Sequence, residues 1–303
     1  MDRIVDIATD GRHLSRARGF LKVSESGTEV GRIPLDDIAA IIVHAHGITW
    51  SNSLLAELAD RGAPVVICDT SHSPRSVVLP LEGHHAQGGR LRAQWTASRP
   101  LFKQSWKRIV IAKIRMQAAA LDAYGEAPAP LEMMARNVTS GDETNLEAQA
   151  ARYYWPRIMG DDFRRDRLAA DANALLNYGY TVLRACASRA VVAAGLHPSI
   201  GIHHSNQGNA FALADDVMEP FRPLVDCAVK SLVARNGTQV DSEAKQTLAR
   251  LIAFDLPMGD TQSPVSVALT KLATSLGQSF EAGKPSLALP SPPDALTLAE
   301  LGK

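Results

Sequence analysis

The sequence contains few cysteines and few aromatic residues. Its three cysteines, Cys68, Cys186 and Cys227, are far apart and form no Cys-x-x-Cys pair. This spacing argues against a cysteine-bound zinc site and is typical of buried free thiols in a cytosolic protein. Phe, Trp and Tyr make up only 5% of the residues. Alanine is abundant from about residue 110 onward, which favours helix in the second part of the chain.

The sequence also lacks a net charge and a long apolar segment. Its 32 Lys and Arg residues balance 32 Asp and Glu residues, so the total charge indicates neither nucleic acid nor an anionic membrane. The first residues, MDRIVDIATDGR, have no apolar signal core. The apolar stretch at 181–202 is interrupted by Arg184 and Arg189 and is too polar for a membrane span. We therefore expect a cytoplasmic protein with no membrane contact.

The hydrophobic pattern changes period near residue 85, which predicts an α+β protein. Before this point, RIVDIA, DDIAAIIV, PVVICD and SVVLPLE predict strands, with one helix at about 51–62. The glycine-rich segment GHHAQGG marks the boundary. We expect a β-rich N-terminal domain (1–85), a larger α-helical domain (86–283) and a proline-rich, flexible tail (284–303). Helices are expected at 98–124, 144–158, 171–195, 216–235, 241–254 and 263–282.

A run without any acidic residue covers 83–121. It contains eight basic residues: Arg90, Arg92, Arg99, Lys103, Lys107, Arg108, Lys113 and Arg115. Like charges four residues apart on a helix, such as Lys103 and Lys107, repel each other. A phosphate backbone would relieve this repulsion, so the run indicates contact with a polyanion. The alternative is a solvated helix face whose acidic partners come from neighbouring segments.

Two adjacent histidines and three acids form a second candidate cluster: His203, His204, Asp215, Asp216 and Glu219. Adjacent histidines in a loop cannot both face the same site. In one interpretation, Asp215 or Asp216 caps a helix and Glu219 is an acid of its first turn, where the helix dipole favours it. In the other, one imidazole and the carboxylates bind a hard metal ion, which suits Mg²⁺ or Mn²⁺ better than zinc. That site needs another acid from a separate element.

Glu147, in the segment TNLEAQAARYYWP, can supply this acid. Thr144 and Glu147 also match a capping box, in which Glu147 only caps its own helix. Ser140 and Glu143 form a competing box, so the capping role does not have to fall on Glu147. The residues alone leave both roles open.

Several motifs together resemble the CRISPR-associated integrase family, the first of the two universal spacer-acquisition proteins. These motifs are NLEAQAARYYW, the LNYGY helix, the GLHP turn, the IHH loop and DVMEPFRP, and they occur in the family's order. The block at 173–226 is the most specific, and RIPLDDIAAIIV and GAPVVICD match the β-rich front more loosely. The HHSNQ loop and the MEPFRP form look closest to type II system members.

The resemblance implies a site and a reaction. By position in the family pattern, the metal ligands fall on Glu147, His204 and Glu219, and Asp216 falls where some members have a further acid. The implied cofactor is Mg²⁺ or Mn²⁺. The implied enzyme is a DNA endonuclease and integrase, in which the 3′-hydroxyl of a short captured DNA attacks a phosphodiester at the border of the CRISPR repeat. No protein nucleophile is needed.

The resemblance also implies partners: a second copy joined through the β-rich domains, a small second adaptation protein, and the captured and repeat DNA. The DNA-binding residues would then come from the basic run: Arg90, Arg92, Arg99, Lys103, Lys107 and Arg108. A non-catalytic DNA-binding scaffold, in which the His and acid cluster only caps a helix, is the alternative function.

Overall fold

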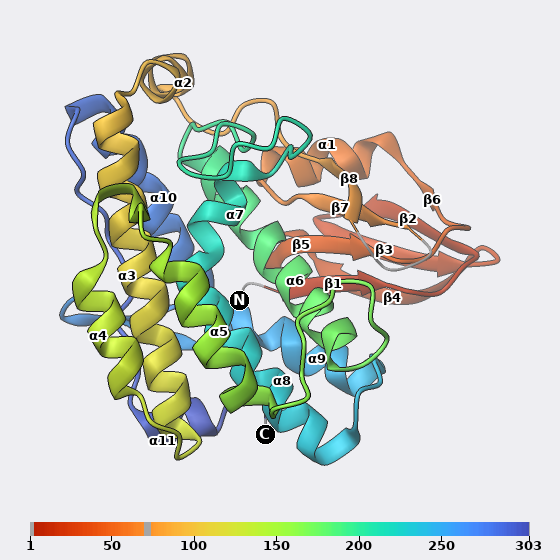
Figure 1. Ribbon diagram of the computed structural model, residues 1–303. Helices are drawn as coiled ribbons and strands as arrows, with labels where there is room; N and C mark the ends of the chain where they lie inside the picture. Colours follow the sequence, from red (N-terminus) through yellow and green to blue (C-terminus); the bar gives the residue numbers. More distant parts are fainter. Residues whose placement is uncertain (1–2, 70–73, 303) are drawn as a thin grey trace.

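The N-terminal part is built from two four-stranded sheets and one helix (Figure 1). The computed structural model describes residues 3–69 and 74–302. The first sheet has the order β1-β5-β7-β8, with β8 antiparallel and the other strands parallel: Arg3–Ile7 (β1), Ile38–Val43 (β5), Val65–Cys68 (β7) and Pro74–Val78 (β8). The second has the order β4-β3-β2-β6: Thr28–Pro34 (β4), Phe20–Glu25 (β3), Arg12–Ala17 (β2) and Thr49–Trp50 (β6). Helix α1 (Asn52–Asp60) is capped by Ser51.

The larger C-terminal part is mainly helical, which confirms the predicted α+β fold class. Its helices are Gln87–Trp95 (α2), Arg99–Ala123 (α3), Ala129–Asn137 (α4), Leu146–Met159 (α5), Ala172–Ala193 (α6), Ala212–Met218 (α7), Arg222–Asn236 (α8), Ser242–Arg250 (α9), Val265–Ala282 (α10) and Ala295–Ala299 (α11). Short 3-10 helices are Leu35–Asp37 (η1), Ser140–Asp142 (η2), Glu219–Phe221 (η3) and Leu251–Ala253 (η4). Within the described ranges, no helix has the length and apolar character needed to cross a membrane.

Strand β5 belongs to two hydrophobic cores at once. All six of its residues are buried. Because side chains alternate across a strand, Ile41 and Val43 face the core between the two sheets, whereas Ala40 and Ile42 face the core of the helical part. The expected boundary near residue 85 falls in the connection between β8 and α2, but the two parts share this strand.

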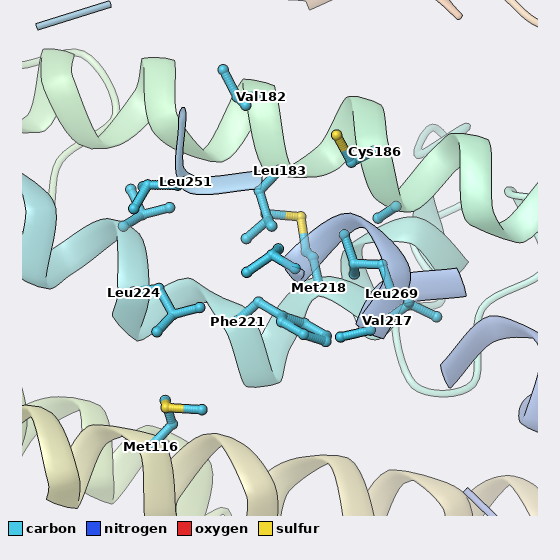
Figure 2. Packing of buried hydrophobic residues seen from close by; sticks show 14 of the residues in the cluster. Met116, Val182, Leu183, Cys186, Val217, Met218, Phe221, Leu224, Leu251 and Leu269 are labelled. Carbon is cyan, nitrogen blue, oxygen red and sulfur yellow. The ribbon is translucent and has the colours of Figure 1, made fainter. Parts of the chain in front are cut away.

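Helix α6 is the central helix of the C-terminal part, as its apolar sequence predicted. It packs on α7, α8, α9 and α10 and touches β5. Figure 2 shows how tightly its side chains meet those of the segment α7-η3-α8, with Leu183 near Met218 and Phe221. Phe221 is fully buried. This packing fixes the backbone on both sides of Glu219.

The last residues differ from the expected flexible tail. Leu298 and Leu301 are buried, and α11 packs against α3 and α8. Ser291 also donates its backbone N–H to the carbonyl of Pro257 (2.9 Å). Leu298 on α11 and Leu301 just after it bury apolar side chains, which outweighs the loosening effect of the prolines. The short strands Asp255–Met258 (β9) and Thr261–Pro264 (β10) were also not expected.

A close approach between α6 and α8 generates a stability prediction. A Cβ atom added to Gly179 would overlap Val225 Cγ1. We expect Gly179→Ala to lower the free energy of unfolding by about 1–3 kcal/mol, measured by urea denaturation, because an overfilled core is strained. Gly89→Ala is the matched control, since nothing lies within 4 Å of that position.

The double variant with Val225→Ala tests the cause. Removing the valine methyl groups makes room for the new one, so the double variant should be more stable than the sum of the two single effects by about 0.5–3 kcal/mol. Simple additivity would show that the overlap is not the source of the loss.

Candidate active site

Glu147 is free to act in a site because other residues cap its helix. Asp142 accepts hydrogen bonds from the backbone N–H groups of Leu146 (2.8 Å) and Glu147 (2.9 Å). Asn145, at the N-cap, accepts one from Ala148 (3.4 Å). These bonds satisfy the first donors of α5. The capping role is therefore filled by Asp142 and Asn145, and not by Glu147.

The two adjacent histidines have different environments. His203 stacks on Trp106 of α3, with ring centroids 4.2 Å apart and an angle of 1° between the planes. The His204 Nδ1 atom lies 2.7 Å from Asp216 Oδ1. Because Nδ1 is hydrogen-bonded to this carboxylate, Nε2 is the ring nitrogen that remains available for a ligand, as in many metal-binding histidines.

Asp216 positions the histidine loop. It is fully buried, and its carboxylate accepts backbone N–H groups from Ile202 (2.5 Å), His203 (3.1 Å) and His204 (3.3 Å). Its oxygens are occupied by the loop, and it does not line the hollow described below. The acid suggested as an accessory group thus holds His204 in place.

Glu219 is a buried carboxylate between two cations. Its Oε1 accepts a hydrogen bond from Arg222 Nε (2.8 Å), and its Oε2 lies 2.5 Å from Lys113 Nζ. Burial would raise the pKa of Glu219, but Arg222 and Lys113 lower it to about 2. Burial likewise opposes the charge on Lys113, yet Glu219 and Glu147 raise its pKa. Glu219 is therefore ionised and Lys113 protonated at neutral pH.

Lys113 joins the two acids. Its ammonium contacts Glu147 as well as Glu219, and its side chain is 10% exposed. The sequence placed this lysine only in a basic run, because two acids distant in sequence became its partners on folding. It is the central residue of the site that sequence reasoning missed.

One hollow of about 260 Å³ brings the predicted ligands together. Its walls include Glu147 from α5, His204 from the loop and Glu219 from η3. The other lining residues are Lys113, Gln117, Ala151, Trp155, Arg165, Arg167, Tyr180, Arg222, Pro223 and Asp226. Two carboxylates and one imidazole from three separate elements thus face the same space.

The donor set is suitable for a divalent cation, although the carboxylates are held by Lys113 here. Among the described residues, no three His, Cys, Asp or Glu side chains are close enough to hold a metal ion. However, Glu219 Oε2 is buried and makes no hydrogen bond of good geometry, despite its nearness to Lys113. Two carboxylate groups and one imidazole are ligands that Mg²⁺ and Mn²⁺ accept. The chemistry of the donors therefore fits such an ion, whereas their spacing here is that of two acids paired with Lys113.

Arginines surround this hollow and a neighbouring one. The second hollow, of about 240 Å³, shares Arg165, Arg167, Tyr180 and Arg222 with the first. Arg165 donates to the amide oxygens of Asn173 and Asn177 (both 2.7 Å). Burial lowers the pKa of Arg165, and nearby arginines add to that effect. The sequence analysis missed this positive surface, although the motif FRRDR at 163–167 is a local signal for it.

The basic run is only partly available to a polyanion. Arg90 is buried, with Nη1 donating to the carbonyl of Ala194 (2.9 Å) and Nε 3.5 Å from Glu281, so the expectation that it contacts DNA does not agree with the structure. Lys103 pairs with Glu143 (2.8 Å). Glu281 and Glu143 come from other segments of the chain, which agrees with the alternative interpretation of the basic run as a helix face with acidic partners elsewhere. Arg92, Arg99 and Arg108 are exposed, and Lys107 is half-buried.

Solved structures share this fold. A casposase bound to integration product aligns with a TM-score of 0.77 at 20% identity, covering 97% of this chain and 93% of that one. A CAS1 protein from Thermotoga maritima aligns with a TM-score of 0.71 at 17% identity, covering 94% and 98%. The chain therefore has an α+β fold that is also found in a casposase and in a CAS1 protein.

Sequence comparisons identify the family. The model of CRISPR associated protein Cas1 matches residues 5–251. The CRISPR-associated endonuclease Cas1 of Neisseria meningitidis serogroup C (strain 8013) is 36% identical over 278 residues, which is 90% of each chain. A Cas1 endonuclease of Pyrobaculum aerophilum is 27% identical over 290 residues, 90% of this chain and 98% of the relative. The chain belongs to the Cas1 family, and the resemblance seen in its sequence is confirmed.

A buried acid on the wall of the hollow generates a pH prediction. Asp226 accepts hydrogen bonds from Tyr154 (3.0 Å) and from Tyr180. Burial raises the pKa of Asp226 to about 6, although both tyrosines act in the opposite direction. Between about pH 4 and 6 the unfolded chain has lost this proton and the folded protein keeps it, so stability falls as pH rises.

The wild-type protein should lose up to about 3 kcal/mol of its free energy of unfolding between pH 4 and 6. We expect Asp226→Asn, which cannot ionise, to remove this loss. Urea denaturation at several pH values measures it. Asp60→Asn, an exposed acid, is the control. Identical pH profiles for Asp226→Asn and the wild-type protein would contradict the assignment.

Proposed function

We propose that this protein is a divalent-metal-dependent DNA integrase and endonuclease. It inserts short captured DNA into a CRISPR array through attack of a 3′-hydroxyl on a phosphodiester at the repeat border. The observation that carries the proposal is the meeting of Glu147, His204 and Glu219 in one arginine-lined hollow. The endonuclease names of its relatives and the casposase bound to integration product support the reaction class.

In this proposal, Glu147, Glu219 and His204 Nε2 would hold Mg²⁺ or Mn²⁺. Such an ion, when bound, would supply polarisation of the scissile phosphate and a lower pKa for the attacking hydroxyl. Asp216 keeps the His204 ring in the tautomer that presents Nε2. Arg165 and Arg222 supply positive charge for the phosphates beside the reacting bond. Lys113, released from the two acids, remains near as a further cation.

The proposed partners follow the same argument. Exposed or partly exposed cations of the basic run, namely Arg92, Arg99, Lys103, Lys107 and Arg108, would contact DNA phosphates, which position the strand without reading its sequence. A Cas6-RT-Cas1–Cas2 complex has a chain of similar fold (TM-score 0.73, 19% identity, 94% of this chain and 36% of that one). This supports a small second Cas protein as partner.

A homodimer through the β-rich part is proposed as well.

Ligand variants test the reaction. Strand transfer of a labelled short duplex into a plasmid carrying a CRISPR repeat is measured with the second Cas protein, in Mg²⁺, Mn²⁺ or EDTA. We expect Asp216→Asn to slow joining by about 10–100-fold, because it only orients a ligand. His204→Ala and Glu147→Gln remove ligands, so joining should fall by more than that, while DNA binding is retained.

The doubled histidine provides a matched control. His203→Phe keeps an aromatic ring against Trp106 and removes no proposed ligand, so it should join DNA at nearly the wild-type rate. Joining that survives His204→Ala but is lost in His203→Phe would assign the ligand to the other ring. Full strand-transfer activity in every variant would contradict the proposed ligands and favour the alternative function, a non-catalytic DNA-binding scaffold.

Metal binding has its own measurement, independent of activity. A ligand at about 100 times its dissociation constant adds about 2.7 kcal/mol to stability. We therefore expect Mn²⁺ to raise the melting temperature of the wild-type protein, and less so that of Glu147→Gln. Lys113→Met, whose two acids lack their ammonium partner, should be less stable without metal and gain more from Mn²⁺. An equal response of all three proteins would contradict the proposed ligands.

A further inference from the structure

Trp95 is an exposed aromatic residue at the end of α2. The chain has four tryptophans, and this one is 75% exposed, whereas Trp50, Trp106 and Trp155 are buried or half-buried. An indole ring has 150–250 Å² to bury, roughly, and usually does so in a core or an interface. A large apolar side chain left in water is the more informative exception.

The helix that carries Trp95 is fixed firmly from its other face. Gln94 is fully buried and donates to the carbonyls of His197 (3.1 Å) and Ile200 (2.8 Å), and its own oxygen accepts the N–H of His197 (2.8 Å). Arg90 is bonded to the end of α6. Trp95 is therefore presented on a rigid support, so binding there costs little ordering of the backbone.

The surroundings of Trp95 are cationic. Arg92 lies three residues earlier on the same face of α2, and Arg99 begins α3; both are exposed. The ion pairs of the acid-free run within the described residues are those of Arg90, Lys103 and Lys113, and Arg92 and Arg99 take part in none. Two exposed arginines without acidic partners, three residues before and four residues after an exposed indole in the sequence, suit a ligand with a flat aromatic face and a negative charge.

An unpaired nucleotide has both of these properties. Its base can stack on the indole while its phosphates meet Arg92 and Arg99. A protein partner is less well matched, because the core of such an interface is depleted in charge and arranged as a larger apolar patch. In a duplex, base faces are covered by their neighbours, so the fit is to single-stranded DNA.

The position of this surface relates it to the candidate active site. Figure 1 shows α2 at the end of α3, beside the loop that follows α6. Gln94 holds the first part of that loop, which continues to His204. We propose that Trp95, with Arg92 and Arg99, is a stacking site for an unpaired base of the DNA strand on which the protein acts. This inference rests on the proposed function and deepens it by naming a contact for single-stranded DNA.

Equilibrium binding tests the inference. Fluorescence anisotropy is measured with a labelled blunt duplex and with the same duplex carrying a single-stranded 3′ extension. One base stacked on an aromatic ring is worth about 5- to 150-fold in affinity. Trp95→Ala should lose affinity within this range for the extended duplex and change less than about twofold for the blunt one. Trp95→Phe should retain most of the affinity, and Met133→Ala, another exposed apolar residue, should retain all of it.

A covalent probe reports the contact directly. A 5-iodouracil in the extension, irradiated with the wild-type protein, should crosslink to Trp95, as mapped by mass spectrometry. Equal affinities of Trp95→Ala and the wild-type protein for the extended duplex, with crosslinks elsewhere, would overturn the inference and leave the proposed function standing. Equal losses on both duplexes, or a changed oligomeric state, would show a duplex or protein contact instead and also overturn it. A wild-type protein that binds neither DNA would overturn both proposals.

Discussion

The site depends on one buried group of charges, in which the ammonium of Lys113 contacts Glu147 and Glu219. Carboxylates removed from water need a cation nearby, since an unpaired buried charge costs several kcal/mol. The lysine lies on α3, and the two acids lie on α5 and η3. This electrostatic contact therefore draws three elements together around the hollow. Arg222 and the Lys113 ammonium together lower the pKa of Glu219 despite its burial, so this acid stays ionised.

The histidine pair shows how neighbouring identical residues acquire different roles. His203 stacks on Trp106, and its ring packs against α3. His204 is turned the other way by Asp216, which binds both its ring and its backbone. A single buried carboxylate thus sets the direction of the imidazole. Because it also holds the preceding backbone N–H groups, the loop and the ring are positioned together.

Periodicity was enough to predict the α+β organisation and the central helix α6, because hydrophobic spacing follows directly from the geometry of strands and helices. The family motifs indicated Glu147, His204 and Glu219. The roles of Lys113 and Arg90 depended on partners distant in sequence, such as Glu219 and Ala194, which no local pattern contains. The packed tail was missed for a similar reason, since Leu298 is buried by α3 and α8 and not by its own neighbours.

Strand β5 has a consequence for how the chain can be divided. Ala40 and Ile42 complete the wall of the helical core, while Ile41 completes the core between the sheets. A fragment starting at α2 would expose the apolar side of its bundle to water, and a fragment ending at β8 would expose the reverse face of its sheet. The two parts are therefore joined by a shared strand in their cores, although the hydrophobic pattern of the sequence changes near residue 85.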